Sequence, residues 1–199
     1  MNFAPSDENI SIKSFKDSFM QTGRLDSEYY QAKYDELIDH IKKANFDKLD
    51  NIVNIKKSIE PGSEAYQDSG IPFIRVSNVT KFGISDTDIY LSRNILKEEE
   101  LQKLYPTKDT ILLSKDGTVG IAYKIKNETE MITSGALLHL SIKKDDVLPE
   151  YLTLVLNSLI VQLQAQRDAG GSIIQHWKPS EIQEVLIPII DISIQNQIE

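Results

Sequence analysis

The chain contains no cysteine among its 199 residues. Disulfide bonds and thiolate metal sites are therefore excluded, and a chain of this length can bury a core without them. No apolar run reaches the roughly 20 residues that a membrane-spanning helix needs. The first residues, MNFAPSDENISIKSF, also lack the basic and apolar regions of a secretory signal. These absences predict a cytoplasmic protein.

An excess of positive charge is also missing. The chain carries 22 Lys and Arg against 30 Asp and Glu, a net charge of −8. This balance argues against a nucleic-acid partner, because phosphate binding needs clustered Lys and Arg. Residues 51–130 are nearly balanced, however, with 11 basic and 12 acidic side chains. One face of this middle part can still be basic, so net charge alone does not decide the partner.

Catalytic patterns are missing as well. His40, His139 and His176 stand apart from one another, and none belongs to an H-x-x-x-H pair. His139 lies inside an apolar run, which favours a hydrogen-bonded core histidine over a metal ligand. No G-x-S-x-G segment is present, and the carboxylates Asp145 and Asp146 adjoin lysines in a predicted solvated turn. We therefore expect no catalytic residue, no metal and no cofactor, in a chain that is not an enzyme on its own.

The stretch LLSKDGTVGIAY, residues 112–123, is the most conspicuous glycine-containing segment. Its order fits neither a phosphate-binding P-loop nor a dinucleotide-binding loop, and the residues after it alternate like a strand. Asp116 and Gly117 are instead a favoured central pair of a β-hairpin turn, and Gly120 suits a bulge or a close backbone approach. The predicted turn presents three polar side chains at its tip: Lys115, Asp116 and Thr118.

Hydrophobic spacing predicts three helices. The first is amphipathic, begins at an Asp26 or Ser27 cap, and has one apolar stripe. The second is acidic and covers residues 95–105, and the third covers residues 149–166 with Pro149 just inside its start. The stripe of the first helix comprises Tyr30, Tyr34, Leu37, Ile38 and Ile41.

Short strand-like segments fill most of the remaining chain. They lie at residues 48–57, 71–79, 88–92, 110–114, 120–126, 136–142 and 184–190. Strands mostly follow strands, which argues against a doubly wound parallel sheet. The predicted class is α+β, a mixed or antiparallel short-stranded sheet with a buried helix and an N-terminal amphipathic helix.

Five segments, in this order and spacing, resemble a known family. They are GIPFIRVSNVTKFGI, DTILLSKDGTVGIAY, ITSGALLHLSI, LPEYLTLVLNS and RDAGGSIIQHWKPSEIQEVLIPII. Together they look like the target recognition domain of the specificity subunit of type I restriction-modification systems. RLDSEYYQAKYDELI also resembles a segment that often precedes such a domain. The resemblance covers residues 24–199.

The resemblance implies a non-catalytic module that reads one half of a split double-stranded DNA site. Such subunits have two recognition domains, and the long helices between them bind methyltransferase subunits, which assemble with restriction subunits. This chain would supply one recognition domain over residues 23–194, after a flexible arm at 1–22. Residues 195–199 would begin a truncated spacer helix.

Loop side chains would make the DNA contacts in this interpretation. The candidates come from the first long strand and its loop, the hairpin and the glycine loop: Arg75, Ser77, Asn78, Lys81, Lys115, Asp116, Thr118, Ser172, Gln175, His176 and Lys178.

Plainer interpretations of these residues stay open. Asn78 can simply cap a turn, Lys81 and Lys178 can be surface lysines, and Gln175 and His176 can tie down their own loop. A different function also stays open: the two apolar helices can form a protein-interaction or oligomerisation face without DNA reading.

Overall fold

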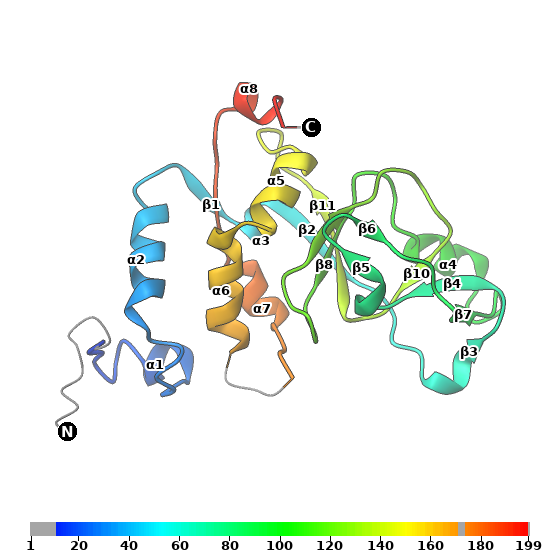
Figure 1. Cartoon of the computed structure of the whole chain (residues 1–199), viewed down its shortest axis with the longest axis horizontal. Coiled ribbons are helices and arrows are strands. Elements are labelled where there is room, and N and C mark those ends of the chain that lie inside the picture. The colour runs from blue at the N-terminus through cyan, green and yellow to red at the C-terminus, as the bar shows by residue number, and fades with distance from the viewer. Residues whose placement is uncertain (1–10, 171–173, 199) are drawn as a thin grey trace.

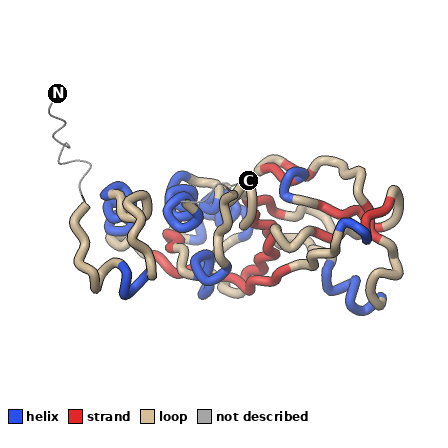
Figure 2. The backbone as a smooth tube through the Cα atoms, turned by 90° about the horizontal axis from the view of Figure 1, so that it is seen from below, coloured by secondary structure: helices blue, strands red, loops and turns tan. Residues whose placement is uncertain are grey.

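The computed structural model describes residues 11–170 and 174–198. The molecule is elongated, with most helices toward one end and most strands toward the other (Figures 1 and 2). The helices are α1 (Phe19–Thr22), α2 (Ala32–Ile41), α3 (Leu49–Ile52), α4 (Glu98–Leu104), α5 (Pro149–Leu156), α6 (Leu159–Ala169), α7 (Pro179–Gln183) and α8 (Ile192–Gln195), with 3-10 turns η2 (Ser63–Ala65) and η3 (Val76–Asn78). The strands are β1 (Phe46–Lys48), β2 (Val53–Lys57), β3 (Tyr66–Gln67), β4 (Ile71–Ile74), β5 (Val79–Thr80), β6 (Gly83–Ile84), β7 (Tyr90–Leu91), β8 (Ile111–Ser114), β9 (Ala122–Lys124), β10 (Ile132–Thr133), β11 (Leu137–Ile142) and β12 (Leu186–Pro188).

An antiparallel sheet of order β2-β11-β8-β9 forms the centre of the molecule. Its side chains alternate between two cores, as the pleat requires. Leu113 and Leu138 pack in a cluster with α5, α6 and α7. Leu112 and Leu137 pack on the other side, in a cluster with β4, β5 and the residues around β10. Because both faces are covered, these strands are nearly continuous apolar runs.

A second sheet has the order β10-β4-β7-β3 and packs against α4. Its β10 and β4 are parallel, whereas its other pairs are antiparallel. The β5-β6 hairpin packs Val79 and Ile84 against the central sheet, and β1 pairs with β12. The predicted α+β class with mixed and antiparallel short strands is confirmed.

The predicted third helix is wrong in one respect, because it is interrupted at Asn157. Its amide Oδ1 accepts from the Ala122 N–H at 3.1 Å, and its Nδ2 donates to the Ala122 carbonyl at 2.8 Å. The side chain thus completes the hydrogen bonding of β9, and α6 starts afresh after Ser158. The strand expected over 71–79 is likewise shorter, since β4 ends at Ile74 and η3 follows it. The strand expected over 48–57 begins as the single turn α3.

The N-terminal amphipathic helix is confirmed as α2, but it begins at Ala32 after an extended Gln31 rather than at the predicted cap. Asp26 is engaged elsewhere, as the partner of Arg24. Tyr34 and Ile41 are buried, and α2 packs against α6 and β12. The apolar stripe is therefore used within the chain. No described helix is both long enough and apolar enough to cross a membrane.

Candidate functional site

Two segments that the sequence separates by about sixty residues lie side by side. The Gly117 N–H donates to the Gln175 carbonyl at 3.0 Å, and the Trp177 N–H donates to the Lys115 carbonyl at 2.8 Å. Asp116 and His176 form an isolated antiparallel bridge between these bonds. In Figure 1 the loop after β8 and the segment before α7 run together at the lower edge. We call residues 115–118 and 175–178 the paired loops.

One carboxylate also joins the paired loops through side chains. Asp116 Oδ1 bonds with His176 Nδ1, and its Oδ2 bonds with the Lys115 ammonium. The Lys115 side chain is only 6% exposed, and its N–H pairs with the Ala136 carbonyl as in a strand. The prediction that Lys115 stands at the hairpin tip is therefore wrong. The exposed tip is formed by Gly117 and Thr118.

Buried residues anchor the second of the paired loops. The Trp177 side chain is fully buried in the helical core, whereas Gln175, His176 and Lys178 around it are exposed. Lys178 precedes α7, and its N–H donates to Glu181 at 3.1 Å. The buried Trp177 thus holds in place a loop whose polar side chains face the solvent, as a binding loop requires. Of the predicted contacts, Ser172 lies outside the described residues.

The glycine loop begins at a cluster that the sequence did not predict. Arg24 donates to the Asp168 carbonyl at 2.9 Å and to the Gly170 carbonyl at 3.2 Å. The guanidinium groups of Arg24 and Arg167 lie 4.6 and 5.2 Å from the Tyr29 ring centre. This cluster fixes the end of α6, from which the glycine loop departs.

Asp168 is the buried acid of this cluster. Burial raises the pKa of its carboxyl, and the hydrogen bond from Arg167 at 2.8 Å opposes that rise. The nearby Trp177 indole acts in the same direction as Arg167. The buried Asp168 carboxyl is paired with the Arg167 guanidinium of the same helix. We therefore assign it a structural role.

Arg75, Ser77 and Asn78, which we call the Arg75 group, lie next to the paired loops through the segment 134–136. The Ser134 N–H donates to the Ile74 carbonyl at 2.8 Å, and the Ala136 carbonyl accepts from Lys115 at 2.9 Å. Arg75, which follows Ile74, is half-buried. Its Nε is buried without a hydrogen-bond partner among the described residues, so a base contact by Arg75 would have to come from the terminal nitrogens of its guanidinium or follow a change of rotamer.

Asn78 behaves as the plainer interpretation expects. Its Oδ1 accepts from the Arg75 N–H at 3.0 Å, and its Nδ2 donates to the Asp86 carbonyl at 3.0 Å. Both ends of its amide thus hold the loop around η3. Ser77 beside it is exposed, and Lys81 stands apart at the tip of the β5-β6 hairpin, next to the exposed Phe82.

His139 is a core histidine, as predicted. It is buried, and its Nε2 is 2.8 Å from Thr133 Oγ1. Burial, with a smaller contribution from the Lys56 charge, lowers the pKa of His139 to about 4. The imidazole is therefore neutral at pH 7. Among the residues that the structure describes, no group of three His, Asp or Glu side chains is arranged to hold a metal ion.

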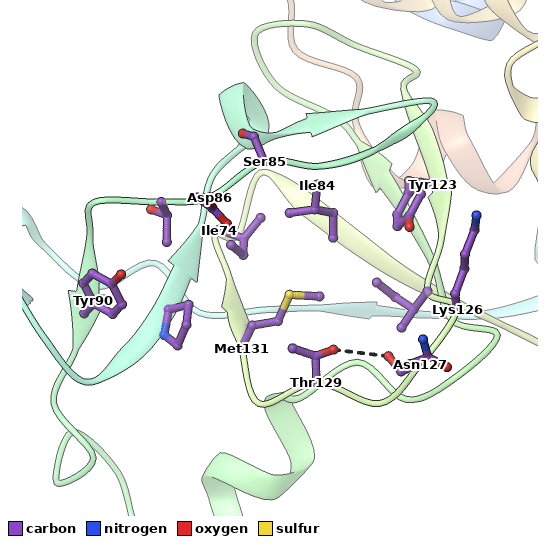
Figure 3. Close-up of a pocket in the computed structure, with 13 residues that line it drawn as sticks. Ile74, Ile84, Ser85, Asp86, Tyr90, Tyr123, Lys126, Asn127, Thr129 and Met131 are labelled. Atoms are coloured by element: carbon purple, nitrogen blue, oxygen red, sulfur yellow. Dashed lines mark hydrogen bonds between the residues drawn. The ribbon is translucent and has the colours of Figure 1, made fainter.

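A pocket of about 450 Å³ opens between the two larger sheets (Figure 3). Ile74, Ile84 and Met131 form its apolar part, while Tyr123 and Asn127 stand at its rim. None of the predicted DNA contacts lines it. The candidate residues gather instead at the edge formed by the paired loops and the Arg75 group, which we call the loop edge.

The sequence analysis missed Arg24 and Trp177, which support the loop edge, and Phe82, which lies outside it. Arg24 and Trp177 carry no local signal, because their roles come from contacts with distant segments. Phe82 did carry a local signal, since it is an aromatic residue beside Lys81 in the loop predicted after the 71–79 strand. Exposed aromatic side chains at such positions are typical of binding surfaces.

Solved structures of restriction-modification proteins share this fold. The S subunit of a type I restriction-modification system from M. genitalium is 15% identical, with a TM-score of 0.54 over 77% of this chain and 36% of its own. The HsdS subunit from Thermoanaerobacter tengcongensis is 19% identical, with a TM-score of 0.54 over 77% of this chain and 35% of its own. The type IIG restriction endonuclease BpuSI is 14% identical, with a TM-score of 0.60 over 87% of this chain and 28% of its own.

The chain thus spans about a third of the length of the two specificity subunits. No curated protein matches it. The family model for the type I restriction modification DNA specificity domain matches residues 28–199, which confirms the resemblance seen in the sequence. The chain belongs to the family of type I restriction modification DNA specificity domains.

Proposed function

We propose that the chain reads a short block of double-stranded DNA with its loop edge. This block would be one half of a bipartite target of a type I restriction-modification complex. Family membership supports DNA recognition. We choose this surface because the backbone hydrogen bonds between the paired loops bring Thr118, Gln175 and His176 together on one edge. The proposal assigns recognition to this chain, within a single domain at 23–194, and leaves catalysis to partner subunits in the cytoplasm.

The side chains at the loop edge suit base reading: Gln175 and His176 are exposed, and Arg75 is half-buried. An amide such as Gln175 can pair with adenine N6 and N7, and a guanidinium such as Arg75 with guanine O6 and N7. The His176 ring is held at Nδ1 by Asp116, which leaves Nε2 for a contact with a base edge.

Phosphate contacts are the weaker part of this surface. Lys115 is paired with Asp116, and Lys178 lies 3.5 Å from Glu181. Few free cations thus face the DNA, in keeping with the net charge of −8. We propose that methyltransferase and restriction subunits supply much of the phosphate binding, so that this chain contributes sequence reading more than affinity.

The interaction-domain alternative depended on an apolar stripe left exposed after folding. On α2, Tyr34 and Ile41 are buried within the chain. On α5, Leu152 and Leu156 are buried in the helical core. Leu159 at the start of α6 is 72% exposed, but most of both stripes is used in folding, which disfavours that alternative.

Selection from a randomised duplex library tests the proposal. The chain, joined to a spacer helix and mixed with a methyltransferase subunit, is used to retain DNA, which is then sequenced. We expect an enriched block of a few base pairs. A folded, assembled complex that enriches no sequence would contradict DNA reading by this chain.

Point variants then test the loop edge. Gln175→Ala or Arg75→Ala should relax base preference by about 1–3 kcal/mol at one position of the enriched block. Lys178→Ala should weaken binding to all sequences alike and reduce the salt slope by about one. Lys43→Ala, an exposed lysine just beyond α2, is the matched control and should change neither quantity. Unchanged preference in both reading variants would show that the reading surface lies elsewhere.

A further inference from the structure

The tip of the β5-β6 hairpin carries an aromatic ring with no role in the fold. Phe82 is 83% exposed, more than any other aromatic side chain among the described residues. Val79 and Ile84, at the base of the same hairpin, pack in a core cluster. The hairpin is thus anchored at its base and apolar at its tip. The Phe82 ring is removed from water only when a partner binds there.

The tip is also ordered. Thr80 Oγ1 accepts from the N–H groups of Phe82 and Gly83, both at 3.2 Å, and donates to the Gly83 carbonyl at 3.1 Å. The strand register pairs Thr80 with Gly83 and Val79 with Ile84. These hydrogen bonds order the backbone that carries Phe82. Binding at the tip would therefore cost little further conformational entropy of the backbone.

A cation accompanies the ring. Lys81 Nζ lies 5.0 Å from the Phe82 ring centre. None of the ion pairs among the described residues involves Lys81. An apolar protein surface covering Phe82 would also have to desolvate this ammonium. DNA offers both partners at once, a phosphate for the ammonium and base faces for the ring.

The hairpin shares its base with the loop edge. Arg75 lies just before η3, which leads directly into β5, and the Asn78 amide ties Arg75 to Asp86 beyond β6. A base contact by Arg75 would therefore bring the hairpin to the same duplex as one stiff unit. This connection is the reason to choose DNA, rather than a second protein, as the occupant of the tip.

We propose that the β5-β6 hairpin is a wedge that enters the DNA during recognition. Lys81 binds a backbone phosphate, and the Phe82 ring inserts at a base-pair step beside the block that the loop edge reads. Insertion of this kind partly unstacks the step and bends the duplex. It therefore favours a flexible pyrimidine–purine step at that position, which adds a sequence preference without a hydrogen bond to any base. The inference rests on the proposed function and extends it to a residue outside the predicted contacts.

The test compares Phe82→Ala, Phe82→Leu and Lys81→Ala in the full chain assembled with a methyltransferase subunit. Phe15→Ala is the matched control, since Phe15 is 61% exposed on the N-terminal segment, away from the hairpin. Affinity for the selected duplex is measured against salt concentration. Fluorescence of 2-aminopurine, placed at successive positions of the duplex, reports unstacking.

We expect Phe82→Ala to lose about tenfold in affinity at an unchanged salt slope, as for the loss of one aromatic–base stacking contact. Phe82→Leu should keep most of the affinity, because an aliphatic wedge can also enter a step. Lys81→Ala should reduce the salt slope by about one. The 2-aminopurine signal should rise at one step with the unmodified chain and Phe15→Ala, and not with Phe82→Ala.

Two outcomes would overturn the inference, and they are distinguishable. If the unmodified chain binds its selected site and Phe82→Ala matches it in affinity and fluorescence, the wedge is refuted while DNA reading stands. If the assembled unmodified chain binds no duplex selectively, the proposed function fails and the wedge fails with it.

Discussion

Replacing Asp116 with asparagine tests whether one carboxylate stabilises the paired loops. Asp116 accepts hydrogen bonds from Lys115 and His176. The variant leaves the Lys115 ammonium, whose side chain is 6% exposed, without its anion. Removing one partner of a fully buried pair costs about 3–5 kcal/mol. Because the Asp116 side chain is 31% exposed and water can reach it, we expect a loss of about 1–3 kcal/mol in the free energy of unfolding.

A second substitution separates this mechanism from a general loosening of the loop. Lys115→Met removes the charge and keeps a long apolar side chain in its buried position. The double variant, Lys115→Met with Asp116→Asn, leaves no unpaired buried charge, so it should be more stable than Asp116→Asn alone. The assay is urea unfolding, at pH 7.5, of the unmodified chain, the two single variants and the double variant. Equal slopes of the unfolding free energy against urea concentration would show that all four unfold in the same way. The coupling energy from the cycle should be about 1–2 kcal/mol.

The reasoning is refuted if the two single losses add in the double variant, because additivity would mean that Lys115 and Asp116 do not depend on each other. An Asp116→Asn protein as stable as the unmodified chain would also refute it. His176 gives an independent readout. An asparagine Oδ1 can still accept from His176 Nδ1, so Asp116→Asn should keep base preference better than His176→Ala.

Three further changes test the scaffold. His139 is expected to take up a proton in the unfolded chain near pH 6.5 but in the folded chain only near pH 4, so stability should fall by about 2 kcal/mol between pH 7.5 and 5; His139→Gln should remove most of this dependence in urea titrations. Asn157→Ala should cost about 2 kcal/mol, because it leaves the Ala122 N–H and carbonyl without their side-chain partner; an unchanged unfolding midpoint would contradict this. Gly120→Ala should cost more than Gly117→Ala by thermal unfolding, since both glycines have positive φ but only at Gly120 does the new Cβ meet a neighbour, 2.9 Å from the Gln162 amide.

The sequence predicted best those elements whose signal is local. Residues 110–114 and 136–142 were recognised as strands because most of their positions are apolar, as expected where both faces of a sheet are largely buried. The α4 helix and its acidic first turn were also recognised. His139 was correctly taken as a core residue because its neighbours in sequence are apolar.

The sequence could not show contacts made across the chain. The 149–166 segment keeps helical spacing throughout, and only the fit of Asn157 to the backbone of β9 explains the break. Lys115 looked like a tip residue because a lysine beside Asp-Gly is usually exposed. Its burial depends on Ala136 and on a carboxylate that also binds His176. The meeting of the two candidate loops was therefore invisible in the sequence, although residues from both were predicted.

The frame of the loop edge does not depend on two of the side chains proposed to read DNA, those of Gln175 and Thr118. Three backbone bonds, Gly117 to Gln175, Trp177 to Lys115 and Lys115 to Ala136, hold the paired loops in place. The buried side chains that lock them are Lys115 and Trp177. The exposed side chains of Gln175 and Thr118 are not required by any of these bonds, so substitutions there should change stability by less than about 0.5 kcal/mol. A surface built in this way can change the sequence it reads without losing its fold, which is what a specificity domain must do.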